Sequence, residues 1–207
     1  FEVIFDLRKR YTLDKKLLLE NHFHFIGVGG IGMSAVAMGL LKKGYSISGS
    51  DLVKNNETDK LEKLGAIIFN SQIGQNIEFI TSKFNNKLIN FVVSTAIKPE
   101  NKELMYCREK NFPVRHRSEI LALLMQSYTA LAVAGSHGKT STSTFLSTLL
   151  ELCTHNSSSI TGGIIPIYDS NCHLEDTKFL VAEVDESDGT IIKYLSLIHI
   201  SEPTRHR

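Results

Sequence analysis

Two glycine-containing segments carry residue types suited to phosphate binding. The first reads Gly27-Val28-Gly29-Gly30-Ile31-Gly32, a G-x-G-x-x-G spacing. Glycine permits a tight turn and close backbone approach, and the N-terminus of a following helix offers N–H groups to a diphosphate. Asp51 lies about where a dinucleotide-binding fold places the acid that holds a ribose. Taken alone, this segment favours an NAD(P)-dependent oxidoreductase, with a turn needed only for packing as the alternative.

The second segment reads Gly135-Ser136-His137-Gly138-Lys139-Thr140 and is typical of a P-loop. Its backbone N–H groups would hold the β-phosphate of ATP, Lys139 would reach the β and γ oxygens, and the Thr140 hydroxyl would bind Mg²⁺. Val133 stands where the general pattern has its first glycine, so the loop is short and a chance G-K-T remains an alternative. We interpret His137 as a phosphate or substrate contact, although it could instead fill the loop by bonding to backbone.

An acidic cluster follows an apolar run, and its members are Glu183, Asp185, Glu186 and Asp188. In P-loop folds a carboxylate at the end of the next strand binds or orients magnesium. A solvated acidic loop is the alternative. Glu183 lies between Ala182 and Val184, where a carboxylate is costly unless it is paired, so we predict Glu183 as a metal ligand.

Alternating apolar runs and helical patterns position these segments and predict a parallel α/β sheet. The stretch 71–87 is polar, and its secondary structure is ambiguous. We expect Ser118 to cap the helix that follows the brief strand after Pro113. The last helix should have an apolar side formed by Phe145, Leu146, Leu149 and Leu150. The predicted strands are 22–27, 45–51, 66–69, 89–94, a brief one after Pro113, 129–136 and 179–184, and the predicted helices are 33–43, 58–65, 100–110, one ending near 126, and 139–153.

Composition narrows the class of protein. The 207 residues are 42% hydrophobic and 22% charged, with a formal net charge of +1, which is ordinary for a globular protein. This balance gives no argument for nucleic acid or an anionic membrane as partner. Three cysteines without C-x-x-C spacing disfavour a disulfide framework and a zinc site, and the chain has no apolar run of membrane-spanning length. We expect a cytoplasmic protein.

With both loops considered, the chain resembles the Mur ligases, which build peptidoglycan precursors. The resemblance covers about residues 22–194, and within the family Met33-Ser34-Ala35 favours the branch that uses L-alanine. The short G-x-x-G-K-T loop is the family's own variant. The matching segments are HFIGVGGIGMSAVA (24–37), SGSD (48–51), VVSTAI (92–97), RHRSEIL (115–121), AVAGSHGKTSTS (132–143), TGG (161–163) and VAEVDESDG (181–189).

The resemblance implies a Rossmann-like domain for a UDP substrate, a P-loop-type ATPase domain and a further domain for the amino acid. It implies ATP-driven amide formation through an acyl phosphate, with UDP-N-acetylmuramate, L-alanine, ATP and Mg²⁺ as small-molecule participants. Lys139 and His137 would act in catalysis, and Thr140 and Glu183 would hold the metal. The implied ATP-binding residues are Gly135, Ser136, His137, Gly138, Lys139, Thr140 and Ser141, and the implied UDP-substrate residues are Gly27, Gly29, Gly30, Ile31, Gly32, Ser50, Asp51, Ser94, Thr95, Ala96, His116 and Arg117.

We place a UDP-substrate domain at 1–126 and the first part of an ATP-binding domain at 127–194. Because the chain begins at Phe1 and loses the family pattern after Tyr194, we interpret both ends as cut and 195–207 as a non-native tail. We therefore expect the chain not to form the amide alone. The alternatives are a ligase that reattaches recycled murein peptide, a folylpolyglutamate-type synthase, an NAD(P) oxidoreductase and a non-catalytic UDP-sugar-binding fragment.

Overall fold

The computed structural model describes residues 20–154 and 156–184, and it divides the chain into two compact units between Ile120 and Leu121, within helix α6. The sequence-based boundary after residue 126 stays a prediction. The last part of the predicted ATP-binding domain, residues 185–194, and the predicted non-native tail at 195–207 lie outside the described residues. No helix within the described ranges is both long and apolar enough to cross a membrane.

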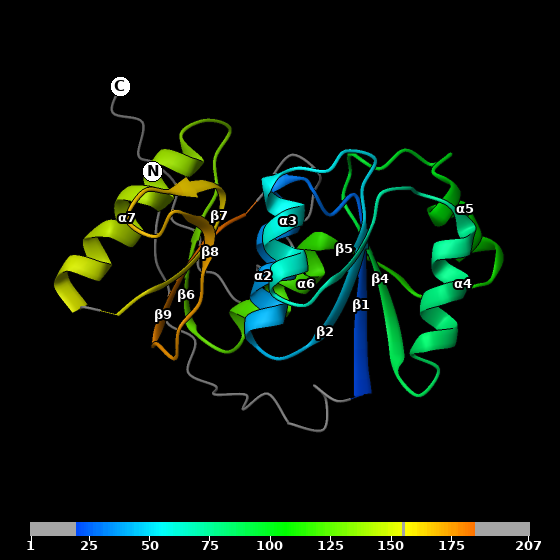
Figure 1. Ribbon diagram of the computed structural model, residues 1–207. Coiled ribbons are helices and arrows are strands. Elements are labelled where there is room, and N and C mark those ends of the chain that lie inside the picture. Colours follow the sequence, from blue (N-terminus) through cyan, green and yellow to red (C-terminus); the bar gives the residue numbers. More distant parts are fainter. Residues whose placement is uncertain (1–19, 155, 185–207) are drawn as a thin grey trace. The chain divides into compact units, whose positions relative to one another are not determined.

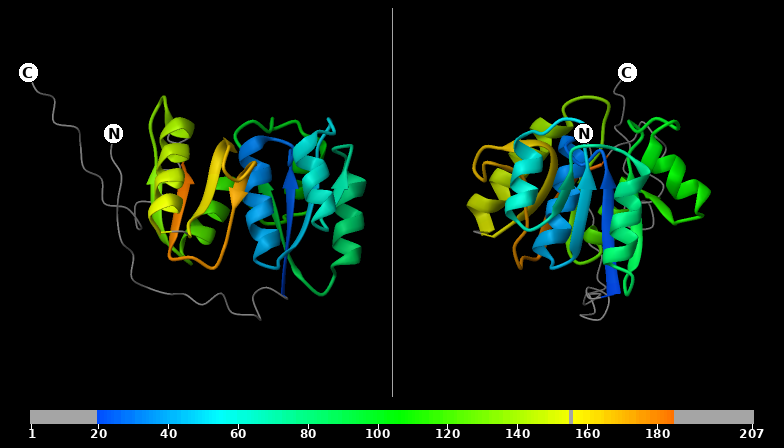
Figure 2. Two further views of the ribbon diagram at one scale, coloured as in Figure 1. Left: turned by 60° about the vertical axis from the view of Figure 1, so that its left-hand side comes forward. Right: turned by 45° about the vertical axis from the view of Figure 1, so that its right-hand side comes forward.

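The first unit is a five-stranded parallel sheet in the order β3-β2-β1-β4-β5. Helices α2 and α3 cover one face of this sheet, and α4 and α5 cover the other (Figures 1 and 2). The order reverses direction between β1 and β4, and ligands of open α/β sheets bind beyond the strand ends at such a point. The elements are β1 (Asn21–Ile26), α2 (Ile31–Lys42), β2 (Ser46–Ser50), α3 (Asn56–Lys63), β3 (Ile67–Phe69), α4 (Gly74–Lys83), β4 (Leu88–Val93), α5 (Lys102–Glu109), β5 (Val114–His116) and α6 (Arg117–Met125).

The second unit has a four-stranded sheet in the order β6-β9-β7-β8. Strands β6, β9 and β7 run parallel, and β8 pairs antiparallel with β7. Helix α7 packs on this sheet, where Leu146 and Leu150 cover a cluster of Leu131, Val133 and Val181. The elements are β6 (Thr129–Val133), α7 (Lys139–Thr154), β7 (Ser158–Ile165), β8 (Ser170–His173) and β9 (Phe179–Glu183).

The expected α/β class is confirmed, with a fully parallel first sheet and a second sheet whose edge strand β8 is antiparallel, but several local expectations need correction. The ambiguous stretch contains helix α4. The expected apolar side of α7 is divided, because Phe145 and Leu149 remain 70% and 45% exposed while their neighbours Leu146 and Leu150 face the sheet. Ser118 lies inside α6 rather than at its cap.

His22, on β1, is fully buried and pairs with two hydroxyls of β2. One ring nitrogen lies 2.8 Å from Ser46 Oγ and the other 2.7 Å from Ser48 Oγ, and the ring stacks on Phe84. Burial, followed by the nearby His24 and Lys87, lowers the pKa of His22 from 6.5 to about 3. The folded state therefore holds this ring neutral at a pH where the unfolded chain protonates it.

This difference predicts loss of stability in acid. Above pH 6.5 the protonation of His22 should not change the free energy of unfolding. As the pH falls from 6.5 to 3, that free energy should decrease by up to about 1.4 kcal/mol per pH unit. Denaturant titrations of the wild type and His22→Gln from pH 7 to pH 4 measure the effect. The variant should start less stable but show a flatter pH dependence, and equal slopes would contradict the assignment.

Candidate functional site

The first glycine turn, 27–32, wraps around the end of β2. Gly27 has a φ of 79°, in the left-handed region that favours glycine. The N–H groups of Gly27 and Val28 both donate to the Ser50 carbonyl, at 2.8 and 3.0 Å. A Cβ on Gly27 would also come within 2.7 Å of Ile97 Cδ1. The turn is therefore fixed from two neighbouring strand ends.

Asp51 and Asn55 fix the middle of the same turn. The Gly29 N–H donates to Asp51 Oδ2 at 2.8 Å, and Asn55 Nδ2 donates to the Gly29 carbonyl at 3.0 Å. A Cβ on Gly29 would lie 2.8 Å from Asp51 Oδ2, so this position requires glycine. Asp51 Oδ1 accepts from the Val53 N–H at 3.1 Å. Each carboxylate oxygen of Asp51 thus accepts a hydrogen bond from a backbone N–H group, a role that the ribose-binding prediction did not include.

The start of α2 provides the electropositive end of the site. Its N-cap, Gly30, supplies no side-chain cap, and its first turn contains no acidic residue. The amide groups at such a terminus carry partial positive charge and favour a phosphate. Arg117 adds a full positive charge there, because a Cβ on Gly32 would lie 2.7 Å from Arg117 Nη1. The helix end and this guanidinium together suit an anionic ligand.

The remaining predicted UDP-substrate residues lie at the ends of β4 and β5. Thr95 and Ala96 are exposed in a turn closed by the Ile97 N–H, which donates to the Ser94 carbonyl at 3.1 Å. His116 caps α6 instead of Ser118: the Ser118 N–H donates to His116 Nδ1 at 3.3 Å, and the Ser118 hydroxyl lies 2.8 Å from that atom. The structure thus brings the predicted residues to the carboxyl ends of four parallel strands in one unit.

The second glycine turn follows β6 and opens α7. Gly135 and Gly138 have φ of 147° and 75°, so both take backbone conformations that other residues rarely adopt. Lys139 Nζ donates to the Gly135 carbonyl at 2.6 Å, which places its charge over the loop. The Thr142 N–H donates to the Gly138 carbonyl at 2.9 Å and begins the helix. Ser136, His137 and Ser141 are exposed, and His137 Nδ1 lies 3.4 Å from Ser136 Oγ.

Glu183 ends β9 beside this turn, because the parallel register aligns it with Val133 of β6. The Thr140 hydroxyl donates to Glu183 Oε2 at 3.1 Å, and the Gly162 N–H donates to the same oxygen at 2.9 Å. A Cβ on Gly162 would lie 2.8 Å from Glu183 Oε1. The carboxylate therefore has protein partners that offset the cost of its position, and its role as a metal ligand stays a prediction.

The chemistry of this pair still suits magnesium. A hydroxyl and a carboxylate offer the oxygen ligands that Mg²⁺ takes, and Mg²⁺ commonly adds phosphate oxygens and water to one or two protein ligands. Within the described ranges no cluster of three or more His, Cys, Asp or Glu side chains could hold a metal by itself. The predicted cluster members Asp185, Glu186 and Asp188 lie outside those ranges. Among the described residues, Thr140 and Glu183 are therefore the pair that would hold Mg²⁺.

Comparison with known proteins identifies the family of the chain. A model of the Mur ligase family, catalytic domain, matches residues 22–129, which is half of the chain. The chain belongs to the Mur ligase family. The matched residues include the first glycine turn and all five strands of its sheet, so the match identifies the family and does not locate the catalytic groups.

Individual Mur ligases show how much of a complete enzyme the chain represents. It is 68% identical over 188 residues to a UDP-N-acetylmuramate–L-alanine ligase of Prochlorococcus marinus subsp. pastoris, covering 91% of the chain and 40% of that protein. The structure of a UDP-N-acetylmuramate-alanine ligase from Thermotoga maritima has a TM-score of 0.69 at 27% identity, covering 80% of the chain and 37% of the other.

A third likeness extends to the fold alone. A UDP-N-acetylmuramate:L-alanyl-gamma-D-glutamyl-meso-diaminopimelate ligase from Neisseria meningitides has a TM-score of 0.72 at 24% identity, covering 81% of the chain and 53% of that protein. By the first of these comparisons, the chain spans about 40% of the length of a curated relative.

The structure gives clear roles to three residues for which the sequence predicted none, although Gly162 lies in the family-matching segment at 161–163. Asn55 holds the Gly29 carbonyl, Gly162 leaves room for Glu183, and Glu103 bonds to Ser50 behind the first turn. Only Asn55 had a local signal, because Asn55 and Thr58 have the spacing of a capping box and form one. The other two are brought to their partners by strand pairing and helix packing.

Neighbouring glycines of the first turn should respond differently to an added methyl group. Gly29→Ala places its Cβ against the Asp51 carboxylate and should cost about 1–3 kcal/mol of stability. Gly30→Ala is the matched control, because its φ is −66° and the nearest atom lies 3.6 Å away. Denaturant midpoints of both variants measure the difference, and equal destabilisation would contradict this geometry.

Proposed function

We propose that this chain contributes the UDP-substrate and ATP sites of a cytoplasmic ligase that joins L-alanine to the carboxylate of UDP-N-acetylmuramate. The reaction class is ATP-dependent amide formation through an acyl phosphate, in peptidoglycan synthesis. Residues 1–126 would bind the UDP substrate and residues 127–194 would begin the ATP-binding domain. The 68% identical relative carries the name of this activity over the region that the chain covers.

One observation carries the proposal most directly, namely the convergence of Lys139, Thr140 and Glu183 at one loop. The ammonium group bonds to the Gly135 carbonyl, and the hydroxyl bonds to the carboxylate. An NAD(P) oxidoreductase has no use for a lysine and a metal-binding pair at a second glycine turn. The set instead matches the requirements of ATP: a cation for the phosphates and oxygen ligands for magnesium.

Each side chain has a defined task in this proposal. When bound, Mg²⁺ supplies Lewis-acid stabilisation of phosphate charge. Thr140 and Glu183 would hold it, while Lys139 would leave the Gly135 carbonyl and offset negative charge on the β and γ oxygens. Exposed His137 would contact phosphate or substrate from the loop. In the other unit, the start of α2 and Arg117 would hold the UDP diphosphate.

The ligase of murein-peptide recycling is the nearest alternative. Its structural likeness at 24% identity concerns the fold, whereas the 68% identical relative is named for L-alanine. Met33-Ser34-Ala35 begins the buried part of α2 and belongs to the same alanine-branch resemblance. These observations favour free L-alanine over a peptide as the amine.

Removal of the Lys139 charge should selectively weaken nucleotide binding. In calorimetry with ATP and Mg²⁺, Lys139→Ala should weaken binding by about 100-fold, because a cation facing phosphate is replaced by a methyl group. Lys178→Ala, an exposed lysine in the same unit, serves as the control and should bind like the wild type. Equal ATP affinity in wild type and Lys139→Ala would contradict the assignment of this loop.

The first unit should discriminate between two nucleotide ligands. We expect saturable binding of UDP-N-acetylmuramate to the 207-residue chain, little effect of NADH as competitor, and unchanged UDP-N-acetylmuramate affinity in Lys139→Ala. Fluorescence or calorimetric titration measures all three. Tight binding of NADH with no binding of UDP-N-acetylmuramate would instead support the oxidoreductase alternative.

A further inference from the structure

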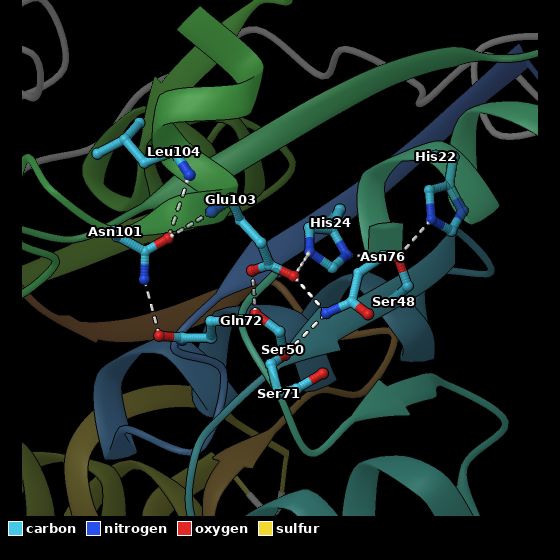
Figure 3. Close-up of polar contacts among 10 residues, drawn as sticks. All are labelled: His22, His24, Ser48, Ser50, Ser71, Gln72, Asn76, Asn101, Glu103 and Leu104. Carbon is cyan, nitrogen blue, oxygen red and sulfur yellow. Dashed lines mark hydrogen bonds and ion pairs between the residues drawn. The ribbon is translucent and has the colours of Figure 1, made fainter. Parts of the chain in front are cut away.

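A buried polar cluster lies at the end of β2, where the Ser50 carbonyl also holds the first glycine turn. It joins residues of β1, β2, α4 and α5 through the carboxylate of Glu103 (Figure 3). Glu103 is fully buried at the start of α5, where an ionisable side chain is rare unless it has partners. Glu103 is not among the predicted UDP-substrate residues, although its partner Ser50 is, so the role of this carboxylate needs its own explanation.

Glu103 has partners on three other elements. The Ser50 hydroxyl, at the end of β2, donates to its Oε2, and Asn76 Nδ2, in α4, donates to its Oε1 at 2.6 Å. His24 Nε2, in β1, lies 3.7 Å from Oε1. Two hydrogen bonds and a nearby imidazole offset part of the cost of removing the carboxylate from water. The resulting contacts fix the positions of four elements relative to one another.

Two asparagines extend this link to the loops at the carboxyl edge of the sheet. Asn76 Nδ2 also donates to the Ser71 carbonyl at 2.8 Å. Asn101 accepts from the Glu103 N–H at 3.0 Å as the cap of α5, and its Nδ2 donates to Gln72 Oε1 at 2.7 Å. The loop after β3 and the start of α5 are therefore tied to the same carboxylate.

Ser50 carries the link to the ligand-facing side. Its hydroxyl bonds to Glu103, while its carbonyl accepts the N–H groups of Gly27 and Val28. The next residue, Asp51, accepts the Gly29 N–H. Three consecutive amides of the glycine turn thus depend on two consecutive residues at the end of β2, and Glu103 anchors the first of them.

From this chain of contacts we propose that Glu103 is a positioning residue for the UDP-substrate site, acting through Ser50. The inference rests on the proposed function for the identity of the ligand. Glu103 touches no ligand; it holds the end of β2 so that the Ser50 carbonyl and the Asp51 carboxylate shape the turn before a diphosphate arrives. Preorganisation of this kind strengthens binding because less ordering occurs when the ligand binds.

Paired serine substitutions separate this role from general support of the fold. Ser50→Ala removes the bond to Glu103 and should weaken binding of UDP-N-acetylmuramate to the 207-residue chain by about tenfold. Ser48→Ala is the matched control: it is a buried serine on the same strand, and its hydroxyl bonds to His22 and His24 instead. That control should lower the thermal midpoint and change the affinity less than about twofold.

Substitutions of Glu103 itself test the hydrogen-bond bridge. Glu103→Gln can keep an oxygen toward Asn76 and donate its amide to the Ser50 hydroxyl, so its affinity should stay within about threefold of the wild type. Glu103→Ala should match Ser50→Ala, and the double variant should bind no more weakly than either single variant. Wild-type affinity in Ser50→Ala, or an equal loss in the Gln and Ala variants, would overturn the proposal.

Hydrogen exchange at the Gly27 and Val28 amides gives a readout that requires no ligand. Ser50→Ala and Glu103→Ala should accelerate exchange of both amides about tenfold, whereas Ser48→Ala should leave them protected. If wild-type chain fails to bind UDP-N-acetylmuramate, the proposed function fails, but this measurement still decides the positioning role. Unchanged exchange in all three variants would overturn it.

Discussion

Both candidate sites depend on one constraint: the first backbone N–H groups of a helix have no partner within that helix. In this chain the constraint occurs twice, where β1 leads into α2 and where β6 leads into α7. Glycines allow each connecting turn to bring these amides close to a ligand, as the positive φ angles of Gly27, Gly135 and Gly138 show. Positive side chains, Arg117 in one unit and Lys139 in the other, then add full charge to the partial charge of the helix end.

The same geometry receives different support in the two units. In the second unit the turn is supported at short range, because the lysine bonds within the loop and Glu183 is aligned by the register of two adjacent strands. In the first unit the turn is supported by the end of β2, which in turn is held by a buried carboxylate from α5. A buried carboxylate is costly, so its presence at this point fits the proposed positioning role better than a gain in stability alone.

Membership in the Mur ligase family and the physical reading of the loops support each other. A glycine turn before a helix would bind NAD or a UDP sugar by the same physics. The proposal of a UDP sugar rests on the second loop, with its lysine and its hydroxyl–carboxylate pair, and on relatives named as UDP-N-acetylmuramate–L-alanine ligases. The chain spans about 40% of the length of such a relative.

The sequence by itself determined the features that depend on local chemistry. Glycine spacing, the lysine of the second loop and the alternation of apolar runs with helical patterns predicted two phosphate turns and parallel α/β architecture. Helix α4 was not predicted from the sequence. It begins at Gly74 without a side-chain cap and leaves Phe79 half exposed, so it lacks both a start signal and a continuous apolar face. Strand β7 was not predicted from the sequence, because Gly162 and Gly163 interrupt its apolar residues.

Only the tertiary structure decided which side chains meet. Leu146 and Leu150 are partly buried against the sheet while Phe145 and Leu149 are exposed, because the direction from which the sheet approaches α7 selects one stripe of the helix. Glu103 reads as an ordinary first-turn acid of α5 until packing brings it to Ser50, 53 residues away in sequence. Such contacts follow from strand order and register, which no local spacing of residues specifies.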